Sequence, residues 1–223
     1  LHDALPISSG VYFIVTPQKT VLFEFLIDSD QYFSIRADTA GINKNIQFIN
    51  SPDNQLFQEY SKTIYTLVKN IKEGEQRLAI LKNSVDKIAI QKQIINCNQQ
   101  IDNYRDNIIK KYPNSLLSVV LRTLKEPSKP TSTKPLTKLD SFYYYKKHYW
   151  DDVQFYDGRL VRTPIFENKL DRYFNQLVSP APDSINKEID WMLLYAQNDS
   201  TMYRFLVGKF IDQYMNPTIM GQD

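Results

Sequence analysis

Four short apolar runs, each bounded by turn-forming residues, follow the first eight residues of the chain. They cover Val11 to Val15, Val21 to Ile27, Tyr32 to Arg36 and Ile46 to Ile49. Val, Ile, Phe and Tyr dominate these runs, and Pro, Gly, Asn and Lys residues lie between them. Residues of these types favour strands and turns respectively. The sequence therefore predicts four successive antiparallel strands.

The second run alternates only weakly between apolar and polar positions. Phe23 and Phe25 share one face, but Leu22 and Leu26 lie on the other face beside Glu24. Such a pattern indicates burial on both faces for part of the strand. Because these strands lie so near the start of the chain, we expect more of the sheet to lie upstream and the incomplete sheet to present an open edge.

After residue 50 the apolar spacing changes from two to a helical period. One seam comprises Phe57, Tyr60, Ile64, Leu67, Ile71, Gly74, Leu78 and Leu81, and a second comprises Ile90, Ile94, Cys97, Ile101, Tyr104 and Ile108. The phase changes at Asn83 and Ser84, whose residue types favour turns and N-caps. We predict two antiparallel helices, over 53–82 and 85–111. One continuous helix is the alternative.

Three residues of this region have specific expected roles. Ser51 or Asp53 is expected to cap the first helix. Gly74 falls on the seam, which predicts a close-packing point or a kink between helices rather than a ligand site. Cys97 is the only cysteine and lies in register with the second seam, so we expect a buried core thiol.

A shorter helix is predicted within NSLLSVVLRTLKEP, after Tyr112-Pro113 ends the second long helix. The following segment, residues 126–138, is rich in Pro, Ser, Thr and Lys and is interpreted as a linker. The opening LHDALPIS resembles the translation of a sequencing-adapter oligonucleotide, so we treat residues 1–8 as a scar. This divides the chain into the scar, a β-sheet and helical hairpin domain over 9–125, the linker, and a helical domain over 139–223.

The last region is rich in aromatic residues and has helical spacing. Helices are expected in DSFYYYKKHYWDDVQF, in FENKLDRYFNQL after Thr163-Pro164, in INKEIDWMLLYA after Asp183, and in TMYRFLVGKFIDQYM after Asp199 or Ser200. Four helices at this density indicate a small all-α bundle. The predicted fold class is therefore α+β, and we expect the C-terminal end to be a cut edge of a longer reading frame.

Composition narrows the function classes. A formal net charge of +2, from 27 basic and 25 acidic residues, offers no electrostatic reason to expect a nucleic-acid partner. No apolar stretch approaches the roughly 20 residues needed to span a bilayer. One cysteine and two histidines cannot supply a disulfide, a zinc cluster or a Ser-His-Asp set. We therefore expect no catalytic, cofactor-binding or metal-binding residues.

The first helix of the aromatic region carries rings on two faces. One face is expected to be core, and the other to pack on a neighbouring helix of the same domain or on an external partner. Tyr144, His148, Trp150 and Arg162 are the candidate partner contacts, because interfaces favour aromatic residues and Arg. Burial of Tyr144 and Trp150 among the domain's own helices would remove the basis of this hypothesis.

Several long strings carry a family resemblance that covers nearly the whole chain after the scar. SPDNQLFQEY, YPNSLLSVVLRTLKEP, YYYKKHYWDDVQFYDGRLVRTPIFENKLDRYF and MYRFLVGKFIDQYMNPTIMGQD resemble Bacteroidetes-type proteins. In that family a β-sheet with a helical hairpin and a helical domain, both of unassigned function, precede a thioredoxin-like domain of the TlpA/ResA type. The active site of that family is a C-x-x-C in the downstream domain, so no catalytic residue can be transferred to this chain.

The resemblance implies a location and a role. The protein would be exported to the periplasmic side of the cell envelope, with a lipid anchor upstream, and its thioredoxin-like domain would exchange disulfides of client proteins. This chain would be a non-catalytic accessory or docking region, with its own downstream domain and client proteins as partners. A protein interaction module without redox function is the alternative. An enzyme using Asp151, Asp152 and Glu167 ranks far below both.

Overall fold

The computed structural model describes residues 7–29, 31–38, 46–81, 83–128, 130 and 136–214. A small antiparallel β region precedes the helices, which confirms the predicted α+β class. The chain forms two compact units. The first contains Tyr12–Ser118, and the second contains Val119–Asp223 together with Ser8–Val11. The described residues of the predicted linker, 126–128, 130 and 136–138, fall within the second unit in this division. The rest of the linker and most of the predicted scar lie outside the described residues.

The predicted strands form two hairpins, which belong to the first unit except for the first two residues of β1. β1 (Gly10–Val15) pairs with β2 (Val21–Ile27), and β3 (Ser34–Arg36) pairs with β4 (Gln47–Ile49) in the register Ile35 opposite Phe48. Each sheet has two strands in the described part of the chain, so the four strands do not make one continuous sheet. Two-stranded sheets are marginal alone, and these lie against the start of a long helix.

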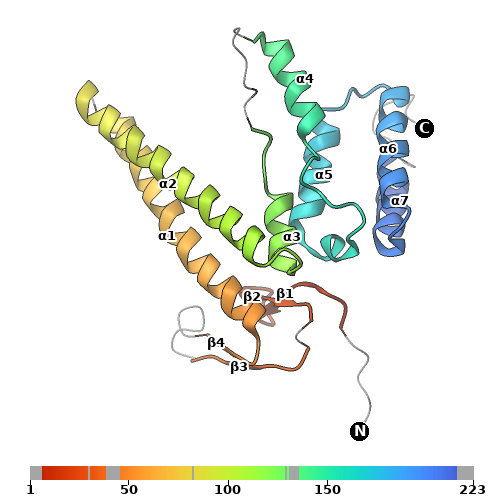
Figure 1. The fold of residues 1–223 in the computed structure, drawn as a ribbon, viewed down its shortest axis with the longest axis horizontal. Coiled ribbons are helices and arrows are strands. Elements are labelled where there is room, and N and C mark those ends of the chain that lie inside the picture. The colour runs from red at the N-terminus through yellow and green to blue at the C-terminus, as the bar shows by residue number, and fades with distance from the viewer. Residues whose placement is uncertain are drawn as a thin grey trace. The chain divides into compact units, whose positions relative to one another are not determined.

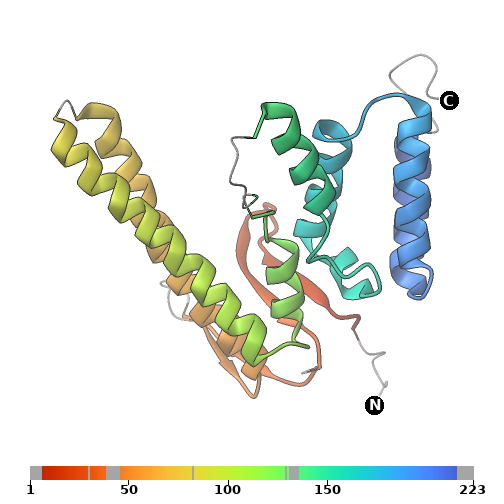
Figure 2. The same ribbon diagram turned by 45° about the horizontal axis from the view of Figure 1, so that its top comes forward.

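The two helical seams pack against each other as an antiparallel hairpin. α1 (Pro52–Ile80) and α2 (Ser84–Lys111) run side by side in Figures 1 and 2, which rules out the alternative of one continuous helix. Asn83 caps α2 by accepting a hydrogen bond from the Val85 amide at 3.0 Å. Cys97 is buried, as predicted. At Gly74 an added Cβ would lie 3.0 Å from Ile94, so this glycine is the predicted close-packing point.

The start of α1 is attached to β2 by a buried side chain. The Asn54 amide accepts from the Leu26 N–H at 2.7 Å and donates to the Leu26 carbonyl at 2.8 Å. Asn54 also donates to Ser51 Oγ at 2.8 Å. Ser51 is the N-cap residue, but its side chain makes no capping bond to the helix backbone. The Asn54 side chain therefore makes the two backbone hydrogen bonds that a neighbouring strand would otherwise make with Leu26 of β2.

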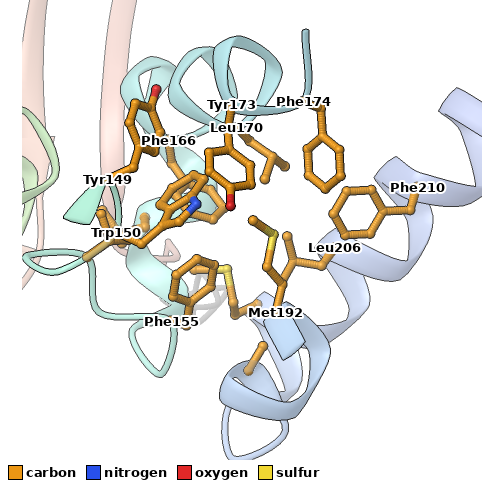
Figure 3. Close-up of a cluster of buried hydrophobic side chains, with 14 of the residues drawn as sticks. Tyr149, Trp150, Phe155, Phe166, Leu170, Tyr173, Phe174, Met192, Leu206 and Phe210 are labelled. Atoms are coloured by element: carbon orange, nitrogen blue, oxygen red, sulfur yellow. The ribbon is translucent and has the colours of Figure 1, made fainter. Parts of the chain in front are cut away.

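The second unit is helical around one aromatic core. It comprises the end of α3 (Leu116–Thr123), α4 (Lys138–His148), the short 3₁₀ helix η1 (Gly158–Arg162), α5 (Pro164–Gln176), α6 (Pro182–Ala196) and α7 (Ser200–Tyr214). Figure 3 shows side chains from α5, α6, α7 and the segment after α4 meeting in this core. The four predicted helices form, but α4 ends at His148 and the remaining predicted helical residues, 149–155, form turns and loop. The sequence patterns did not indicate η1.

Two glycines of this unit differ sharply in their surroundings, so replacing each of them with alanine gives a matched pair of variants. An added Cβ at Gly158 would lie 2.5 Å from Asp199 Oδ1 and 2.8 Å from Thr201 Cβ, but at Gly208 it would meet nothing within 4 Å. We expect Gly158→Ala to destabilise the unit by about 1–3 kcal/mol. Gly208→Ala should stabilise it by up to about 1 kcal/mol through helix propensity. Urea unfolding followed by tryptophan fluorescence measures both, and equal effects would contradict the packing seen at η1.

Candidate functional site: an aromatic cleft in the second unit

The second unit contains a cleft of about 770 Å³ between α4, α5, α6 and the segment after α4. We call it the aromatic cleft. Rings supply most of its lining: Tyr143, Trp150, Phe155, Tyr156, Tyr173, Trp191 and Tyr195. Val153 is its aliphatic member, and Lys146, Lys147, Asp151 and Glu188 add charges of both signs. The lining therefore favours ligands that stack on flat rings over strongly charged ligands.

The rings of the cleft form a buried floor and an exposed rim. Trp150, Phe155 and Tyr173 belong to the core of the unit and are drawn at its centre in Figure 3. Tyr143, Tyr156 and Tyr195 are 60%, 62% and 64% exposed and form the rim. Trp191 joins the floor to the rim, because its ring centroid lies 5.5 Å from that of Phe155 and 5.6 Å from that of Tyr195. The core therefore contacts the rim through Trp191, which packs against Tyr195.

A half-buried carboxylate fixes the wall of the cleft. Glu188 accepts hydrogen bonds from Trp191 Nε1 at 2.5 Å and from the Tyr173 hydroxyl at 2.9 Å, and it pairs with Lys146 Nζ at 2.7 Å. Burial alone would raise the pKa of Glu188, but the three donors outweigh burial and lower it. The carboxylate is therefore charged at neutral pH, and its stabilising effect is lost only when acid protonates it in the folded protein. Glu188 positions Trp191 rather than offering a proton.

The indole of Trp150 is held differently from that of Trp191. Its N–H is buried and makes no well-formed hydrogen bond, although it faces the Tyr173 hydroxyl. Burial and the contact with Glu188 both raise the pKa of Tyr173, so this hydroxyl stays protonated and donates to the carboxylate. The floor of the cleft is therefore a packed aromatic surface.

A second cluster of charged and phenolic groups lies on the other side of α5. Arg172 donates to both Glu126 carboxylate oxygens, at 2.6 and 2.8 Å, and to the hydroxyls of Tyr149 and Tyr145, at 2.9 and 2.7 Å. Burial and the Glu126 contact raise the pKa of Tyr145 to about 12. Lys169 Nζ donates to the Lys125 carbonyl at 2.8 Å, and burial lowers its pKa. These bonds tie the segment after α3 to α5, which is a structural role.

The structure does not gather the predicted contact residues at one surface. Trp150 is 9% exposed and lies in the core. Tyr144 and His148 are half-buried, with ring centroids 4.3 Å apart, and His148 Nδ1 lies 2.6 Å from Asp151 Oδ2. Arg162 donates to the Ser9 carbonyl at 2.7 Å. Of the four, only Trp150 lines the aromatic cleft, so partner contact by this set stays a prediction.

Sequence reasoning did not single out the α6 residues of the cleft. Glu188, Trp191 and Tyr195 are spaced by three and four positions, which places them on one helical face. That face was available in INKEIDWMLLYA, but its pairing with residues 143–156 depends on how the helices pack. The spacing alone could have suggested an exposed Trp and Tyr stripe and no more than that.

None of the helices in the described parts of the chain is long and apolar enough to cross a membrane. Those parts also contain no group of His, Cys, Asp and Glu residues arranged to hold a metal ion.

Comparison with known proteins identifies one family. No curated protein and no solved structure matches the chain. The family described as "Domain of unknown function (DUF5106)" matches residues 96–216, from the middle of α2 to just past α7. The match includes every residue of the aromatic cleft and covers more than half of the chain. The chain therefore belongs to the DUF5106 family.

Proposed function

We propose that this chain is a non-catalytic docking region, and that its aromatic cleft binds extended polypeptide segments of a partner protein. The exposed rim of Tyr143, Tyr156 and Tyr195 above a rigid floor carries this proposal. Tyr and Trp supply large contact area with few rotatable bonds, so little conformational entropy is lost when a partner covers them. Hot spots of protein interfaces are enriched in the same residue types.

The charges of the cleft favour a polypeptide over a strongly charged ligand. Lys146 pairs with Glu188, and Lys147 and Asp151 add one charge of each sign, so neither sign dominates the lining. A polypeptide offers apolar and proline side chains that stack on rings, and backbone carbonyls that accept hydrogen bonds from tyrosine hydroxyls. The exposed tyrosine rings of the rim can stack on such side chains, and their hydroxyls can donate to such carbonyls.

We further propose that the docking region serves a thioredoxin-like thiol-disulfide oxidoreductase domain of the same protein, exported to the cell envelope. The motif strings given above support this assignment, and a cleft that holds an extended client chain near a redox centre would raise the effective concentration of its cysteines. A protein interaction module without redox function is the second candidate, and the same cleft supports it.

Binding of an unfolded protein tests the docking role. Trp150 and Trp191 both line the cleft and are the only tryptophans of the chain, so their fluorescence reports occupancy. The probe is a reduced, carboxymethylated protein that lacks tryptophan. We expect saturable binding, and the double variant Tyr156→Ser, Tyr195→Ser should weaken it at least about tenfold, because each ring is worth about 1 kcal/mol or more.

Tyr203→Ser is the matched control. Tyr203 is an exposed tyrosine of α7 that does not line the cleft, so its replacement should leave the dissociation constant unchanged. Absence of saturable binding, or equal weakening by the control, would contradict a docking role for the cleft.

The redox assignment has a separate test. The reading frame of the source DNA is extended in both directions and translated. A downstream C-x-x-C in a strand–helix context, with an export signal upstream, would support the oxidoreductase assignment. An unrelated downstream domain would refute it and leave the interaction module.

A further inference from the structure

A second, smaller cavity of about 260 Å³ lies between one face of α5 and the end of α3 with the segment that follows it. We call it the α5 cavity. Its α5 wall includes Lys169 and Arg172, and its opposite wall includes Thr123 and Glu126. The lining therefore carries two positive charges and one negative charge. None of its residues lines the aromatic cleft, so the two hollows are separate.

Lys169 is buried without a carboxylate bonded to it. The residue is 8% exposed, and its Nζ forms no ion pair within the described part of the chain. Its neighbours are the Lys125 carbonyl, which accepts a hydrogen bond at 2.8 Å, and the Tyr149 ring, whose centroid lies 4.7 Å away. Lysine is rarely buried unless it is paired, and its ammonium has three donors. The contacts described thus leave this ammonium with a donor that has no acceptor.

Arg172 also keeps donors that its described hydrogen bonds do not use. Its Nη2 donates to both oxygens of Glu126 and to the Tyr145 hydroxyl, and its Nε donates to the Tyr149 hydroxyl. Its Nη1 takes part in none of these bonds, and the guanidinium has five N–H donors in all. The Glu126 charge offsets only one of the two cations. The α5 cavity therefore combines one net positive charge with cationic N–H groups that lack acceptors among the described residues.

We propose that the α5 cavity binds the carboxylate group of a ligand, held by the Lys169 ammonium and by Nη1 of Arg172. One net positive charge matches a monovalent anion, and the planar guanidinium matches the geometry of a carboxylate. The volume is below that of a typical drug-sized pocket, so it accommodates a carboxylate with few attached atoms. The group can belong to a small organic acid or to the C-terminus of a polypeptide, because both present the same two oxygens. This site does not depend on the docking role of the aromatic cleft.

Backbone amide NMR of the full chain tests the proposal, in a titration with N-acetylglycine to about 50 mM at constant ionic strength, since ligands this small bind weakly. The amide signals of residues 168–172 should shift and saturate. N-acetylglycinamide is the matched neutral ligand and should give no saturable shift there. N-acetyltrialanine carries the same carboxylate at the end of a peptide. Tighter binding of this peptide would identify a polypeptide C-terminus as the source, and equal or weaker binding would identify a small acid.

Lys169→Met removes the ammonium and keeps an unbranched side chain, and it should weaken N-acetylglycine binding at least about tenfold. Lys187→Met is the control, because Lys187 is an exposed lysine of α6 outside the cavity, and it should leave the dissociation constant unchanged. Unchanged affinity in Lys169→Met, or equal weakening by the control, would overturn the proposal. No saturable shift with N-acetylglycine, or the same shifts with the neutral amide, would overturn it as well. These last two comparisons use the unmodified chain, so they decide the question even if Lys169→Met does not fold.

Discussion

Asn54→Ala is expected to destabilise the first unit by about 3–4 kcal/mol, because it leaves buried backbone groups without partners. Asn54 is fully buried and bonds to both the N–H and the carbonyl of Leu26. Alanine can replace neither bond, and water cannot reach either group without opening the contact between β2 and α1. The loss therefore includes the desolvation cost of two backbone groups as well as the bonds themselves.

Amide hydrogen exchange of β2 and the first turns of α1 measures this effect. Tryptophan fluorescence cannot report it, because Trp150 and Trp191 both belong to the second unit. Asn98→Ala is the control. Asn98 is exposed on α2 and bonds only to the Ile94 carbonyl of its own helix, at 3.0 Å, among the bonds described, so we expect a change within about 0.5 kcal/mol. Similar losses for both variants would mean that Asn54 does not hold β2 on α1.

Leu206→Ala should destabilise the second unit by about 3–5 kcal/mol, through lost burial and the cavity that remains. Leu206 is 0% exposed and lies among Phe166, Leu170 and Met192 in the core. Figure 3 shows its side chain directed into this cluster. Ring packing on several sides limits how far the cavity can collapse, which favours a loss toward the upper part of that range.

Urea unfolding followed by tryptophan fluorescence measures this loss, since both indoles lie in the same unit. Leu194→Ala makes the same chemical change at a residue of α6 that is 60% exposed, and it should cost less than about 1 kcal/mol. If the two leucine variants lost equal stability, Leu206 would not be a core residue.

Helix and strand positions could be predicted because each depends on a local period. The spacing of three and four from Phe57 to Leu78 corresponds to α1, and the phase change at Asn83 corresponds to the turn before α2. Pro164 and Asp199 mark helix starts through backbone chemistry that acts within a few residues. These features need no knowledge of what lies elsewhere in the fold.

Pairings between distant segments could not be predicted in the same way. Asn54 resembles any polar residue in a first helical turn until β2 is placed beside it. Trp150 has the residue type of an interface contact, but the rings of Phe155, Phe166 and Tyr173 enclose it in the core. Tyr195 is the opposite case. Its local spacing fits either a core or a surface position, and the tertiary structure exposes it at the rim of the cleft.

By itself, the sequence determined the α+β class, the helical hairpin, the helical segments of the second unit and the burial of Cys97, because periodicity and caps act over neighbouring residues. Only the tertiary structure decided that the strands pair as two hairpins, that Glu188 holds Trp191 in the wall of a cleft, and that Asn54 completes the edge of β2. Each of these depends on side chains from separate elements meeting in space, and the free energy of such contacts is set by packing and burial that no local pattern contains.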